Sequence, residues 1–170
     1  TYLWDREGIV SKNNIKLINE VVNSNTDFSG HWAKSYIIDG MNNGWIDTTN
    51  VFNPERFITR AEFIKIVNRA FDITQIGQEN FSDVDPGDWF YDEVRIATNA
   101  GYINGRGNGI FAPYDPITRQ EAAKIIGYLT NKIDYKFTYL STFNDGNLVQ
   151  DWAKPYVEGV LKAGYMNGYA

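Results

Sequence analysis

Residues 58–63 read Ile-Thr-Arg-Ala-Glu-Phe, and residues 117–122 read Ile-Thr-Arg-Gln-Glu-Ala. In each hexapeptide the Thr and the Glu have the spacing of a capping box, in which the hydroxyl and the carboxylate satisfy the free backbone N–H groups of a helix start. Apolar residues continue at helical spacing beyond both segments. The sequence therefore predicts one helix that begins after Thr59 and another that begins after Thr118.

The Arg that follows each capping Thr has no such local explanation. Arg60 and Arg119 stand at the first helical position, where the helix dipole favours anions over cations. Ligand binding or an ordinary salt bridge would each account for a cation in this place, and the hexapeptides alone leave both open.

Two further motifs recur in the same order around the hexapeptides. A segment that starts with Phe and ends with Trp occupies residues 28–32, 81–89 and 143–152. A triplet of Gly, an aromatic residue and Ile or Met occupies residues 44–46, 101–103 and 164–166. The step from Trp to Gly is 12 residues in every copy (32 to 44, 89 to 101, 152 to 164). Such constant spacing indicates one repeated structural unit.

The third copy lacks its second half, and the N-terminal segment has the pattern of that missing piece. Setting Lys16 on Lys65 and Lys124 aligns apolar residues with apolar residues along the whole helix. We therefore expect one module over residues 1–170, with the second half of a split repeat at 1–25, repeats at 26–78 and 79–138, and the first half of the split repeat at 139–170. The two ends should complete one repeat, either within one chain or by domain swapping.

Each repeat predicts a short amphipathic helix in its first half and an ordered loop after it. In the second copy, apolar residues recur at helical spacing from Trp89 to Ala100, and Gly101 follows in the position typical of a helix end. Residues 101–116 are rich in Gly, Asn, Asp and Pro, which predicts a loop without a long regular element.

The composition limits the classes of partner. The formal net charge of −5 disfavours a nucleic-acid partner, and the absence of cysteine excludes disulfides and thiol chemistry. No apolar run approaches the roughly 18 residues of a membrane span, so we expect no membrane insertion. His31 is the only histidine, and we expect neither a metal nor a cofactor.

Taken together, the ordered motifs resemble the surface-layer-homology repeat of bacterial envelope proteins, over nearly the whole chain. The resemblance implies a mainly α fold in which three repeats form a pseudo-threefold trimer. This trimer would have a central three-helix bundle and three helix-loop prongs. The resemblance also implies an extracellular, non-enzymatic cell-wall anchor. Such modules bind secondary cell-wall polysaccharides, often through a pyruvylated N-acetylmannosamine, in grooves between neighbouring prongs.

By this resemblance, the Arg of the hexapeptide, here Arg60 and Arg119, binds the carboxylate of the sugar. A guanidinium suits a permanent anion because it can donate two parallel hydrogen bonds. In the N-terminal half-repeat the guanidinium is missing, and Lys12 would be a point-charge substitute for it.

Three other residue types complete the expected grooves. A Trp at the repeat start offers its ring or indole N–H to the sugar, or packs the first helix. An Asp accepts hydrogen bonds or fixes a loop, and a Gly lets the backbone approach the ligand or makes a turn. These residues are Trp32, Trp89, Trp152, Asp83, Asp145, Gly105 and Gly168. The first copy departs from the pattern, with Gly30 in the place of the Asp and Asp27 before Phe28.

Other readings are weaker. A glycoside hydrolase needs a pair of carboxylates across the scissile bond. The sequence shows no such pair, and the recurring Glu62 and Glu121 are explained by the capping boxes. The run Asp83-x-Asp85-x-x-Asp88 lacks the Gly and Glu of a calcium-binding loop, because those places hold Asp88 and Val94. A structural repeat that packs other domains or S-layer subunits, without binding glycan, stays open as the main alternative.

Overall fold

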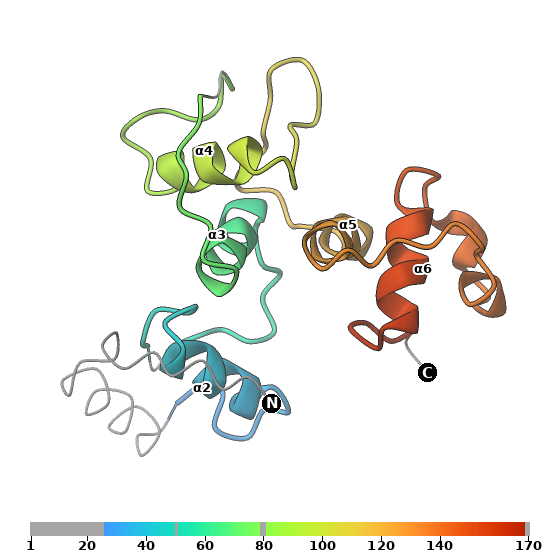
Figure 1. Ribbon diagram of the computed structural model, residues 1–170. Helices are drawn as coiled ribbons and strands as arrows, with labels where there is room; N and C mark the ends of the chain where they lie inside the picture. Colours follow the sequence, from blue (N-terminus) through green and yellow to red (C-terminus); the bar gives the residue numbers. More distant parts are fainter. Residues whose placement is uncertain (1–25, 50, 79–80, 169–170) are drawn as a thin grey trace.

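The computed structural model describes residues 26–49, 51–78 and 81–168 of the chain. Over these ranges the protein is helical and contains no strand, only two isolated bridges, so the expected mainly α fold is confirmed. Figure 1 shows the order of the elements along the chain. These are α2 (Lys34–Asn42), α3 (Arg60–Ala70), α4 (Tyr91–Asn99), α5 (Arg119–Leu129), the short 3₁₀ helices η1 (Leu140–Thr142) and η2 (Gly146–Leu148), and α6 (Lys154–Lys162).

Both predicted capping boxes are present. The Thr59 hydroxyl accepts the Glu62 backbone N–H at 3.2 Å, and the Glu62 carboxylate accepts the Thr59 N–H at 2.9 Å. Thr118 and Glu121 repeat this exchange at 3.3 and 2.8 Å. Helices α3 and α5 thus begin where the hexapeptides place them.

The helices of the first half-repeats end as expected. Helices α2, α4 and α6 each have 9 residues, and each is followed closely by a glycine with positive φ. Gly44, Gly101 and Gly164 have φ values of 72°, 73° and 72°. In this left-handed region a side chain would be strained, which explains the Gly in all three copies. Helix α4 starts at Tyr91, two residues later than the predicted start at Trp89.

Each long helix packs on a short one. Helix α4 packs against α3, and α6 packs against α5 (Figure 1). The core between α3 and α4 is closed by Tyr102, whose buried hydroxyl donates to Asn68 Oδ1 at 2.6 Å. Burial raises the pKa of this phenol, because it disfavours the phenolate.

The start of α3 lies against the segment that leads into α5. Arg60 N–H donates to the Asp115 carbonyl at 2.9 Å, and Ala61 N–H donates to the Pro113 carbonyl at 3.0 Å. These helices are two of the three that a central bundle requires. The third was predicted within residues 1–25, which lie outside the described residues, so the threefold closure stays a prediction.

Helix α6 approaches α5 very closely through glycine. A Cβ on Gly159 of α6 would collide with the carbonyl oxygen of Lys132, which follows α5. Gly127 of α5 faces the same oxygen, and a Cβ there would meet it at 2.9 Å. The helices can therefore pack at this distance only without side chains at these positions.

Gly159→Ala is expected to lower the free energy of unfolding by about 1–3 kcal/mol, because backbone must move to admit the methyl group. Alanine otherwise favours a helix interior, so a site with free space would gain stability from the change. Thermal unfolding followed by circular dichroism measures the effect. Gly87→Ala is the matched control, since a Cβ at Gly87 meets nothing within 4 Å. An unchanged or higher Tm for Gly159→Ala would contradict the close approach.

Candidate functional site

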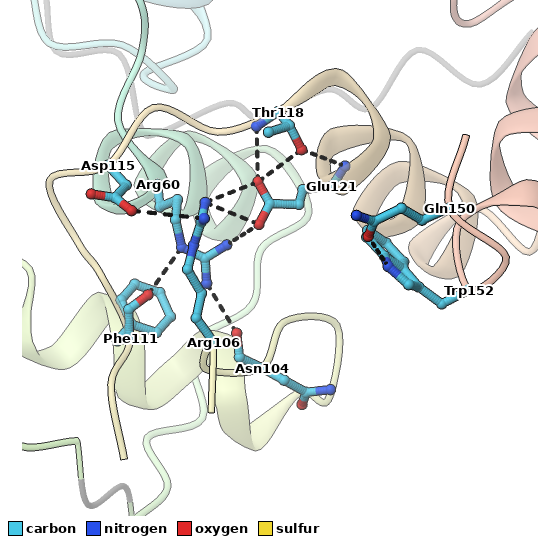
Figure 2. A network of polar contacts seen from close by, with 9 residues as sticks. All are labelled: Arg60, Asn104, Arg106, Phe111, Asp115, Thr118, Glu121, Gln150 and Trp152. Atoms are coloured by element: carbon cyan, nitrogen blue, oxygen red, sulfur yellow. Dashed lines mark hydrogen bonds and ion pairs between the residues drawn. The ribbon is translucent and has the colours of Figure 1, made fainter. Parts of the chain in front are cut away.

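Arg60 is held inside the protein by the repeat that follows it. Figure 2 shows its side chain reaching from the start of α3 into the loop of the second repeat. Nη1 donates to Glu121 Oε1 at 2.8 Å, Nη2 donates to the Asn104 carbonyl at 3.0 Å, and Nε donates to the Phe111 carbonyl at 3.0 Å. The guanidinium also lies 4.8 Å from the centre of the Phe111 ring. Arg60 is only 2% exposed, so these contacts tie two repeats together.

The Arg60 site is a local concentration of charge. Burial lowers the pKa of Arg60, because it disfavours the charged guanidinium, and the Glu121 carboxylate opposes this effect. Arg106 adds a second cation, with Nη2 at 3.2 Å from Glu121 Oε1 and Nη1 at 3.7 Å from Asp115 (Figure 2). Glu121 therefore caps α5 and binds two guanidinium groups at once.

Arg119 makes one of the same contacts in a more open setting. Its Nη2 donates to the Asn167 carbonyl at 2.6 Å, as Arg60 does to the corresponding Asn104. Arg119 itself is exposed. It borders a cavity of about 690 Å³ between α5 and the third repeat, which we call the Arg119 groove. Its lining includes Arg119, Phe143, Asp145, Leu148, Met166 and Gly168.

The predicted Asp residue of the second repeat fixes a loop. The Asp83 carboxylate accepts the backbone N–H groups of Phe111 and Ala112 at 2.8 and 2.7 Å. Asp83 and Arg60 thus hold the N–H and the carbonyl of the same residue, Phe111. This brings two of the predicted site residues together, although both act on the protein's own backbone.

In the first repeat Asp27 fixes the loop in the same way as Asp83 does in the second. Its carboxylate accepts the N–H groups of Phe52 and Asn53 at 2.8 and 2.6 Å, which are the positions corresponding to Phe111 and Ala112. The displaced Asp27 thus fixes the loop of the first repeat, although Gly30 stands in the place of the Asp. A carboxylate can bind this loop from one residue before the Phe of the repeat start, as Asp27 does, or from two residues after it, as Asp83 does. Aligning the repeats on the Phe could not show that the two positions are equivalent.

The three repeat-start tryptophans have different surroundings. Trp32, Trp89 and Trp152 are 80%, 52% and 45% exposed. Trp32 lies 6.4 Å from Tyr36 between ring centres. The Trp152 indole N–H donates to the Gln150 side chain (Figure 2). The Gln150 backbone N–H donates to the Gln120 side chain of α5. All three keep surface on which a sugar ring could stack.

Trp89 belongs to a second cavity, which the hexapeptides did not reveal. This cavity of about 350 Å³ lies between the first repeat and Trp89, and we call it the Lys65 groove. The Lys65 ammonium lies 5.5 Å from the centre of the Trp89 ring. The polar and aromatic residues that line it are Trp45, Asp47, Thr49, Phe52, Asn53, Arg56, Glu62, Lys65, Arg69 and Trp89.

Cations in the Lys65 groove are paired within the groove. Arg56 binds both carboxylate oxygens of Glu62, at 3.1 and 2.7 Å. Asp47 accepts from Lys65 at 2.7 Å and from Arg69 at 2.8 Å. These two hydrogen bonds lower the pKa of Asp47. The only sequence signal for this cluster was Lys65 itself, which recurs in the alignment of the repeats.

The predicted glycines serve close packing. A Cβ on Gly105 would meet the Phe81 ring at 2.5 Å and the Ile110 carbonyl at 2.6 Å, and one on Gly168 would collide with the Phe143 ring. Gly168 also lines the Arg119 groove, whereas Lys12 lies outside the described residues. Within the described ranges no helix is long and apolar enough to span a membrane, and no three acidic or histidine side chains are placed to hold a metal.

The sequence matches a known family in the same segments. The family model described as S-layer homology domain matches residues 26–64 and 80–123. Among similar proteins, the surface-layer 125 kDa protein of Lysinibacillus sphaericus is 36% identical over 72% of this chain. The exoglucanase XynX of Acetivibrio thermocellus is 32% identical over 84% of the chain, and the cellulosome-anchoring protein of the same species is 29% identical over 70%.

These matches cover only small parts of the relatives. The aligned chain spans 11% of the surface-layer protein, 14% of the exoglucanase and 28% of the cellulosome-anchoring protein. The similarity therefore concerns a shared module and does not extend to the remaining parts of those proteins.

Proposed function

Because this chain belongs to the S-layer homology family, we propose that it anchors a surface protein to the bacterial cell wall by binding an anionic polysaccharide between its repeats. Its place is the extracellular cell surface, as for its S-layer and anchoring relatives. The binding of a pyruvylated secondary cell-wall polysaccharide is the specific part of the proposal.

The Arg119 groove is the observation that supports this function best. Its volume of about 690 Å³ lies within the usual range of ligand pockets, and it joins an exposed guanidinium to apolar walls. A sugar carrying a carboxylate needs both features, because its ring has apolar faces and its acid needs a charged donor. Among the predicted residues, Arg119, Asp145 and Gly168 come together in this groove.

Cell-wall co-sedimentation tests the proposal. The purified chain should pellet with walls that carry their secondary polysaccharide and stay in solution with walls from which that polymer has been extracted. Equal binding to both preparations would reject the polysaccharide as the ligand. The alternative, a module that packs other domains or S-layer subunits, predicts no dependence on the polymer.

Arg119→Ala is expected to weaken polysaccharide binding at least tenfold, because a charge-assisted hydrogen bond contributes about 1.5–3 kcal/mol. Arg119→Lys should recover only part of the loss, since an ammonium cannot donate two parallel hydrogen bonds. Isothermal titration with the purified polymer gives the affinities. Wild-type affinity in both variants would remove Arg119 from the site, while their thermal unfolding checks that the fold is kept.

We propose no enzymatic activity. The relatives named for glycan hydrolysis align with this chain over small parts of their length, 14% for the exoglucanase and 8% for an amylopullulanase of Thermoanaerobacterium thermosulfurigenes. The activities in their names therefore concern whole proteins, of which a similar module forms only a small part.

A further inference from the structure

Asp47 lies over the cations of the Lys65 groove. Its two carboxylate oxygens bind different partners, Oδ2 the Lys65 ammonium at 2.7 Å and Oδ1 the Arg69 guanidinium at 2.8 Å. The side chain of Asp47 is 68% exposed, whereas those of Lys65 and Arg69 are 26% and 34% exposed. The carboxylate therefore sits on the solvent side of the two cations, where an incoming anion would have to bind.

The next repeat lacks this internal anion. Asn104 stands where the first repeat has Asp47, three residues after the recurring glycine in each case, and Tyr128 stands where it has Arg69. Lys124, which corresponds to Lys65, has no ion-pair partner among the described residues. Burial and the nearby Arg60 lower the pKa of Lys124, as expected for an ammonium without a paired carboxylate.

We propose that Asp47 is a specificity-determining residue that fills the anion position of the Lys65 groove, so that this groove accepts an uncharged sugar ring in preference to one bearing a carboxylate. The proposal rests on the proposed glycan-binding function. Trp89 supplies the apolar face for the ring beside Lys65, and Arg56 is neutralised by Glu62. A second carboxylate entering the groove would meet Asp47 first and be repelled.

Removing the charge of Asp47 should invert this preference. Asp47→Asn leaves Lys65 and Arg69 without their shared carboxylate and keeps the size of the side chain. The two cations lie one helical turn apart on the same face of α3, so a ligand carboxylate can bind both as Asp47 does. Asp39→Asn is the matched control, because it removes the same charge from an exposed position of α2 that does not line the groove.

The experiment uses the full chain and two probes, the methyl glycosides of N-acetylmannosamine with and without a pyruvate ketal. Binding is followed by NMR at the indole N–H of Trp89, identified by its loss in Trp89→Phe. In the wild type the ketal sugar should bind at Trp89 no more tightly than the plain sugar. In Asp47→Asn its Kd should fall at least tenfold, with the plain sugar changing less than twofold. Asp39→Asn should behave as wild type, and adding Arg69→Gln to Asp47→Asn should cancel most of the gain.

Two results overturn the proposal in distinguishable ways. If the sugars bind but Asp47→Asn leaves the preference at Trp89 unchanged, Asp47 does not set specificity, and the anchoring function stands. If neither sugar shifts any backbone amide or indole signal in the wild type or in the variant, the glycan-binding function fails and this inference fails with it.

Discussion

Arg60→Met is expected to lower the free energy of unfolding by about 3–5 kcal/mol, the usual effect of removing one partner from a buried ion pair. The change leaves Glu121 without its shortest ion-pair contact, 2.8 Å, and leaves the carbonyl oxygens of Asn104 and Phe111 without their donor. Methionine keeps much of the apolar volume, so the loss reports the polar contacts more than a cavity.

Urea denaturation followed by tryptophan fluorescence measures this effect, with Arg119→Met as the matched control. Arg119 occupies the same position of its repeat but is exposed, and a surface change of this kind should cost less than about 1 kcal/mol. If the two variants lose equal stability, the burial of Arg60 does not give it a larger structural role than the exposed Arg119 has, and this prediction is wrong.

Deletion of residues 1–25 is expected to destabilise the whole module. In the second repeat, Phe111 is buried, and its N–H is held by Asp83. In the third repeat Asp145 is the corresponding Asp and lines the open Arg119 groove. The sequence alignment places Leu3 in the register of Phe111, and the N-terminal half-repeat is expected to complete the split repeat.

The apolar stripe predicted for that half-repeat consists of Ile15, Leu17, Ile18 and Val21, so burying it should contribute on the order of 5 kcal/mol. The midpoint of thermal unfolding should then fall by about 10 °C or more. Calorimetry measures the fall, and adding a synthetic peptide of residues 1–25 should restore part of it. An unchanged Tm would contradict the closure. A dimer of the intact chain in light scattering would indicate domain swapping instead.

Local rules predicted the elements of the fold. The capping boxes at Thr59 and Thr118 and the glycines after α2, α4 and α6 depend on contacts within a few residues, which the sequence shows directly. The surroundings of Arg60 depend on partners 44, 51 and 61 residues away, which a hexapeptide cannot reveal. The sequence therefore left open whether this Arg binds a ligand or a salt-bridge partner.

Equivalent positions with unlike residues were the hardest to predict. Arg95 of α4 donates from Nε to the Gly77 carbonyl at 2.9 Å and so holds the segment before its repeat. Glu158, at the same position of α6, accepts the N–H groups of Tyr139 and Leu140 at 2.9 and 2.6 Å and holds the corresponding segment. A cation and an anion can hold the same backbone segment, because the backbone offers carbonyl acceptors to one and N–H donors to the other.

Titration of the chain with purified secondary cell-wall polysaccharide, before and after chemical removal of its pyruvyl groups, tests the central claim most directly. We predict saturable binding of the native polymer and at least a tenfold loss of affinity for the polymer without pyruvyl groups, because the carboxylate that Arg119 would bind is gone. Equal affinity for the two polymers, or no binding of either, would contradict the account.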